Sequence, residues 1–88
     1  MPLREFIASL RPPGTYDAWV AALAARGWPI SRAALEHYVS GRRRPESEVF
    51  ARLLVVAGRA EDDREGWRVW GAAIGIPDGV IGTDQAAP

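Results

Sequence analysis

The chain has 88 residues, 48% of them hydrophobic and 25% charged, a balance typical of one small globular domain. It has no cysteine and one histidine, which excludes a disulfide framework, a thiolate metal site and a histidine metal cluster within one chain. No apolar run approaches the roughly 18 residues of a membrane span, and the N-terminus lacks the pattern of a signal peptide. We therefore expect a cytoplasmic protein without a membrane contact.

The net charge is zero, but the charges are unevenly distributed along the chain. Residues 32–44 carry four arginines against one glutamate, a net charge of +3. Residues 45–88 carry four arginines against eight acidic residues, a net charge of −4. This distribution predicts that one face of the protein contacts a polyanion and that another face does not.

Apolar residues recur three and four positions apart along most of the chain, which is the spacing of amphipathic helices. Thr15 and Ser31 are suited to cap the second and third helices, and Gly41 is suited to end the third. Residues 1–74 form one expected domain, and residues 75–88, rich in glycine, proline and small side chains, an expected flexible tail. The predicted fold is all-α, a compact bundle of about five short helices near 3–11, 15–26, 31–40, 46–57 and 62–74.

The third helix has one apolar side and one small or polar side. If Leu35 lies in the core, Tyr38 and Val39 fall within about 60° of it around the helix axis. A helix fits the major groove of DNA when its outward face is not bulky. Glutamate and histidine on such a face are also typical of an ordinary solvated surface, so this alternative stays open. The predicted base contacts are Arg32, Ala33, Glu36, His37 and Ser40.

Three consecutive arginines follow the third helix and precede Pro45. Neighbouring like charges repel one another unless a partner compensates them, and a solubilising loop is the alternative interpretation. Beside a helix in a groove, these side chains would meet the DNA backbone, where contacts orient the protein without specifying sequence. The predicted phosphate contacts are Ser31, Arg42, Arg43 and Arg44.

The spacing of the residues from 31 to 45 resembles the helix-turn-helix of the lambda-repressor-like Cro/CI-type family, also called XRE. Residues 3–58 fall within the resemblance, and the segment 31–58 is its specific part. Two features depart from the family pattern: Val39 replaces a common glutamate, and the turn "GWPIS" is longer than usual. The residues that match the family pattern are Ser31, Leu35, Tyr38, Gly41, Arg42, Arg43, Arg44 and Pro45.

The resemblance implies sequence-specific binding of double-stranded DNA with the third helix in the major groove. Members of the family commonly bind as homodimers to a near-palindromic site, with recognition helices about 34 Å apart. The resemblance therefore implies a transcriptional regulator, and the small size suggests a repressor of the phage, plasmid or toxin–antitoxin type.

Four tryptophans are many for a chain of 88 residues. Trp19 is expected in the core, and Trp28 is expected to cover it from the turn between the second and third helices. The fifth helix carries Trp67, Trp70 and Ile74 on one face, which either packs on its own chain or forms a dimer interface.

The rival function is a helix-turn-helix module for protein interaction that uses this tryptophan-bearing helix. Such a module would act as an antitoxin, a host-takeover factor or a DNA-packaging recognition subunit. An enzyme is not expected, because no catalytic triad, paired-carboxylate cleft or phosphate-binding loop can be assembled, and no cofactor or metal is expected either.

Overall fold

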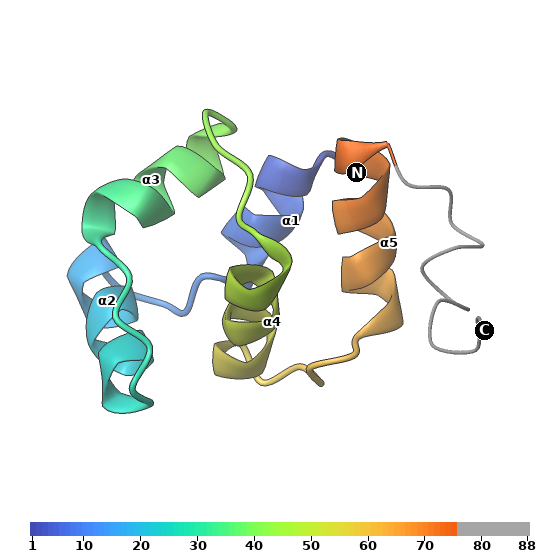
Figure 1. Cartoon of the computed structure of the whole chain (residues 1–88). Coiled ribbons are helices and arrows are strands. Elements are labelled where there is room, and N and C mark those ends of the chain that lie inside the picture. The colour runs from blue at the N-terminus through green and yellow to red at the C-terminus, as the bar shows by residue number, and fades with distance from the viewer. Residues whose placement is uncertain (76–88) are drawn as a thin grey trace.

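The computed structural model describes residues 1–75, and residues 76–88 lie outside the described part of the chain. The described part contains helices and no strand (Figure 1). This confirms the predicted all-α class, while the predicted flexible tail falls, apart from Gly75, outside the described residues. The five helices are α1 Leu3–Leu10, α2 Tyr16–Ala25, α3 Arg32–Ser40, α4 Ser47–Val56 and α5 Arg64–Ile74.

The first helix, α1, is the central element of the bundle. It packs against α3, α4 and α5, and α2 packs against α3 and α4. Figure 1 shows α3 along one edge of the molecule and the turn between α4 and α5 on the opposite edge. None of the described helices combines the length and the apolar character that crossing a membrane requires. The position of α3 at the periphery leaves one of its sides free of other helices.

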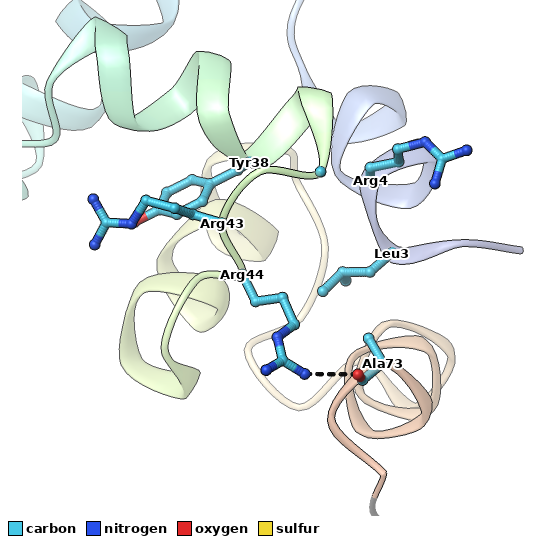
Figure 2. Close-up of a pocket in the computed structure, with 7 residues that line it drawn as sticks. Leu3, Arg4, Tyr38, Arg43, Arg44 and Ala73 are labelled. Atoms are coloured by element: carbon cyan, nitrogen blue, oxygen red, sulfur yellow. Dashed lines mark hydrogen bonds between the residues drawn. The ribbon is translucent and has the colours of Figure 1, made fainter.

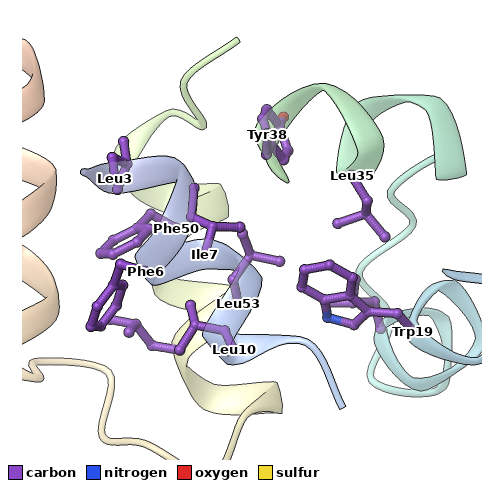
Figure 3. Close-up of a cluster of buried hydrophobic side chains, with 11 residues drawn as sticks. Leu3, Phe6, Ile7, Leu10, Trp19, Leu35, Tyr38, Phe50 and Leu53 are labelled. Atoms are coloured by element: carbon purple, nitrogen blue, oxygen red, sulfur yellow. The ribbon is translucent and has the colours of Figure 1, made fainter. Parts of the chain in front are cut away.

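The apolar sides of α1 to α4 meet in one core (Figure 3). Burial of a large apolar side chain contributes about 1.5–3 kcal/mol to stability, so this cluster is the main force that holds the helices together. Trp19 is fully buried, as predicted. The buried apolar residues are Leu3, Phe6, Ile7, Leu10, Trp19, Leu23, Leu35, Tyr38, Phe50, Leu53 and Leu54.

Two side-chain caps fix the starts of α2 and α3 at the predicted residues. The Thr15 hydroxyl accepts a hydrogen bond from the backbone N–H of Ala18, and the Ser31 hydroxyl accepts one from Ala34, both at 3.1 Å. Each cap satisfies a backbone N–H that has no partner within its helix, which typically contributes about 1 kcal/mol. The first turns of α2 and α3 are thus fixed at the predicted residues.

The turn between α2 and α3 is long, as the sequence predicts, and spans residues 26–31. Its Trp28 packs against the core. The guanidinium carbons of Arg26 and Arg52 lie 5.9 and 5.7 Å from the centre of the Trp28 ring, within the range of a cation–π interaction. Trp28 therefore links the end of α2 to α4 while it covers the core.

The last helix, α5, joins the bundle through aromatic contacts. The ring of Trp67 meets that of Phe50 edge-on, with ring centroids 5.0 Å apart. The indole nitrogen of Trp70 donates a hydrogen bond of 2.9 Å to the carbonyl oxygen of Pro45. Together with Ile74, both tryptophans are half-buried in the single chain. The helix thus packs on its own chain, and its predicted role as a dimer interface stays a prediction.

Candidate nucleic-acid interface

The outward side of α3 is the first component of the candidate site. Leu35 and Tyr38 point into the core and fix the rotation of the helix about its axis. The opposite side carries short or polar side chains, as the helical spacing predicts. The predicted base contacts on this side are Ala33, Glu36, His37 and Ser40, and Arg32 lies on its flank. All five are fully or partly exposed.

The turn after α3 is a tight glycine cap. Gly41 adopts a left-handed conformation with φ +84°, which disfavours any residue that carries a Cβ. The N–H of Arg42 donates to the carbonyl oxygen of His37 at 2.9 Å, and the N–H of Gly41 donates to that of Tyr38 at 3.3 Å. This pair of bonds is a Schellman motif, and it aims the arginine segment directly off the end of the helix.

The arginines after Gly41 differ in their contacts. Arg42 and Arg43 are exposed, and their guanidinium groups form no hydrogen bond or ion pair within residues 1–75. Arg44 instead donates a hydrogen bond of 2.7 Å to the carbonyl oxygen of Ala73 in α5. Arg42 and Arg43 are therefore free to meet an external anion, whereas Arg44 has an intramolecular partner that the sequence did not reveal.

Arg4 is an additional cation at this end of α3 that the sequence did not single out. It belongs to α1, is exposed, and has no hydrogen bond or ion pair in the described chain. A Cβ placed on Gly41 would lie 3.1 Å from the Cδ of Arg4, so the arginine stem runs alongside the turn. The basic group at the end of α3 thus consists of Arg4, Arg42 and Arg43. Only the packing of α1 on α3 brings Arg4 there.

A cavity of about 200 Å³ lies beside the same turn, between α1, α3 and α5 (Figure 2). Figure 2 shows the guanidinium groups of Arg4 and Arg43 extending away from it in opposite directions, and that of Arg44 reaching toward Ala73. The cavity is lined by both apolar and polar groups, from Leu3, Arg4, Tyr38, Gly41, Arg43, Arg44 and Ala73. Cations that do not converge cannot enclose an anion, so the exterior of the turn, and not the cavity, is the candidate surface for an anion.

Arg32 lies at the other end of α3, on the flank of the outward side. Its Nε donates to Oε2 of Glu36 at 2.9 Å, and its NH1 lies 3.6 Å from Oδ1 of Asp17. The hydrogen bond that Arg32 donates to Glu36 and then the negative charge of Asp17 raise the pKa of Arg32 above its ordinary value. The arginine therefore remains charged at any physiological pH. Among the predicted base contacts, Arg32 and Glu36 are held by ion pairs in the described chain.

Negative charge gathers on the opposite side of the molecule. The start of α5 carries Asp63 and Glu65, which pair with Arg59 at 2.9 and 3.4 Å. Figure 1 shows this turn on the edge away from α3. The charges that are uneven along the sequence are therefore also separated in space. Arg4, Arg42 and Arg43 lie at one edge of the molecule, and the acidic cluster lies at the other. Within residues 1–75, acidic and histidine side chains do not assemble into a group that could hold a metal ion.

Comparison with protein-family models, with curated proteins and with solved structures finds no significant match to this chain. The resemblance to the Cro/CI-type family therefore rests on the residues from 31 to 58 and stays a prediction. The geometry of α3 and its flanking arginines is an independent argument about function.

Proposed function

We propose that the protein is a sequence-specific double-stranded DNA-binding transcriptional regulator, a repressor of the phage, plasmid or toxin–antitoxin type. The observation that carries this proposal lies at one edge of the bundle. There the outward side of α3 has short and polar side chains, and it ends beside guanidinium groups that have no partner within the described residues. A slim polar helix fits the major groove, and guanidinium groups beside it suit the phosphates. Occupation of an operator would then block access of the polymerase.

The roles within the site follow from the chemistry of each side chain. Ala33 permits close approach and suits contact with a thymine methyl group, while His37 and Ser40 supply hydrogen-bonding groups for base edges. Arg42, Arg43 and Arg4 are proposed as phosphate contacts. Arg44 is not among them, because its guanidinium group donates a hydrogen bond to Ala73.

The N-terminal end of α3 supplies one more backbone contact. The hydroxyl oxygen of Ser31 accepts the cap hydrogen bond, so its hydrogen can still be donated to a phosphate oxygen. Contacts at both ends of the helix would fix its register in the groove.

A homodimer on a near-palindromic site is part of the proposal. Met1 is the only large apolar side chain of residues 1–75 that is mostly exposed, so little apolar surface is fully open for an interface. We therefore expect the free protein to be monomeric at low concentration and the two-fold arrangement to form on DNA.

Protein interaction through the fifth helix is the alternative function, and it requires the tryptophans to face a partner. The indole nitrogen of Trp67 donates to the carbonyl oxygen of Glu61 at 2.8 Å, and that of Trp70 donates to Pro45. These internal contacts support DNA binding over the alternative.

The test is the salt dependence of binding to a duplex selected from a random-sequence pool. The logarithm of the affinity should fall by about 0.9 per logarithmic unit of salt for each neutralised phosphate. Arg42→Ala and Arg43→Ala should each flatten this slope by about 0.9, and Arg64→Ala, at the exposed start of α5, should leave it unchanged. A slope near zero in the parent protein would contradict the proposal.

A further inference from the structure

Arg32 is held by carboxylates from two different helices. Glu36 lies one turn further along α3 and accepts from Nε at 2.9 Å, while Asp17 in the first turn of α2 lies 3.6 Å from NH1. The guanidinium carbon is also 5.9 Å from the ring centre of Tyr16. Despite these neighbours, 57% of the Arg32 side chain is exposed. The guanidinium group is thus anchored on one side and open on the other.

The open side retains enough donors for a specific contact. A guanidinium group has five N–H donors in a fixed plane. Glu36 uses the one on Nε and Asp17 approaches NH1, while NH2 has no hydrogen bond or ion pair in the described chain. The NH1–NH2 end of Arg32 can therefore donate two parallel hydrogen bonds. Guanine presents N7 and O6 side by side in the major groove, which is the acceptor pair that this geometry matches.

The net charge of Arg32, Asp17 and Glu36 favours a base edge over a phosphate as the partner of Arg32. Arg32 carries one positive charge, and Asp17 and Glu36 carry one negative charge each, so the group is negative as a whole. A phosphate would be repelled by the two carboxylates, whereas the edge of a base is neutral. The same carboxylates reduce the rotational freedom of the arginine, which lowers the entropy lost when a contact forms.

We infer that Asp17 and Glu36 are positioning residues that orient Arg32 for bidentate recognition of a guanine in the bound DNA. This inference rests on the proposed function. It goes beyond that function by specifying one base, guanine, and the two residues that orient Arg32 toward it. Asp17 belongs to the helix that precedes the recognition helix, so α2 contributes to sequence preference without touching the base.

The experiment compares Asp17→Asn, Glu36→Gln and Arg32→Ala with the parent protein. Glu48→Gln is the matched control, because Glu48 also forms an i,i+4 pair with an arginine, Arg52, at 2.6 Å on α4. Each protein is used to select duplexes from a random pool. Affinity is then measured over a range of salt for the selected duplex and for the same duplex with the guanine replaced by adenine.

The parent protein should prefer the guanine duplex by about ten-fold. Asp17→Asn and Glu36→Gln should each reduce this preference and yet tighten binding to both duplexes, because each removes a negative charge. Arg32→Ala should abolish the preference and leave the salt slope unchanged. Glu48→Gln should keep the preference of the parent.

Two outcomes would overturn the inference while DNA binding stands. One is an unchanged guanine preference in both carboxamide variants. The other is an Arg32→Ala variant that flattens the salt slope by about 0.9 and selects the same bases, which would make Arg32 a phosphate contact. Absence of salt-dependent binding in the parent protein would instead overturn the proposed function itself, so the two failures are distinguishable.

Discussion

The guanidinium group of Arg44 donates a hydrogen bond of 2.7 Å to the carbonyl oxygen of Ala73, which joins the turn after α3 to the last turn of α5 (Figure 2). The carbonyl groups of a last helical turn carry the negative end of the helix dipole, so a cation is favourable there. Three neighbouring arginines that look equivalent in the sequence thus have different surroundings. Arg44 connects two helices, whereas Arg42 and Arg43 face outward.

Arg44→Ala should therefore affect stability more than DNA binding. Loss of the bond to Ala73 should lower the free energy of unfolding by about 1 kcal/mol, measured by urea denaturation. The salt slope of duplex binding should remain that of the parent, whereas Arg43→Ala should flatten the slope and leave stability unchanged. If Arg44→Ala instead flattens the salt slope and leaves the free energy of unfolding unchanged, Arg44 is a phosphate contact.

Gly41→Ala tests whether the glycine cap aims the arginines. A Cβ at φ +84° strains the backbone by about 1–2 kcal/mol and lies 3.1 Å from the Cδ of Arg4. Gly58→Ala is the control, because Gly58 has φ +85° with no atom within 4 Å of its added Cβ. Both variants should lose similar stability in thermal unfolding, but only Gly41→Ala should weaken duplex binding. Equal binding by both variants would show that the cap does not position the basic segment.

A third prediction concerns Trp19, whose indole nitrogen is buried without a hydrogen-bond partner in the described chain. Trp19→Phe leaves a smaller ring but removes the unsatisfied donor, so the change in unfolding free energy should stay within about 1 kcal/mol. Trp70→Phe breaks the bond to Pro45 and should destabilise more, by about 1–2 kcal/mol, although Trp70 is less buried. A larger loss for Trp19→Phe than for Trp70→Phe in urea denaturation would contradict this ordering.

Local signals account for the parts of the structure that the sequence predicts well. The caps at Thr15 and Ser31, the glycine after α3 and the apolar spacing around Leu35 act over one or two turns of helix. Short-range geometry of this kind can be derived from residue type and spacing alone. The five helices and the outward side of α3 follow from it.

The parts that the sequence does not predict depend on contacts between distant segments. Arg44 and Ala73 are 29 positions apart, and Arg4 reaches Gly41 only because α1 packs against α3. The pairing of Asp17 with Arg32 likewise requires the relative placement of α2 and α3. No periodicity within one helix encodes such contacts, and they decide which arginines are free and which are held.

Arg4 supplies the sharpest test of the basic group at the end of α3. Its guanidinium group has no partner among the described residues and lies beside the turn that carries Arg42 and Arg43, so it should neutralise one further phosphate. Arg4→Ala should flatten the salt slope of duplex binding by about 0.9 without changing the selected sequence, because a backbone contact carries no base preference. Arg64→Ala removes an exposed arginine of equal charge from the opposite edge of the molecule and should have no effect on the slope. If the two variants behave alike, attraction arises from overall charge, and the basic group at the end of α3 is not a phosphate-binding surface.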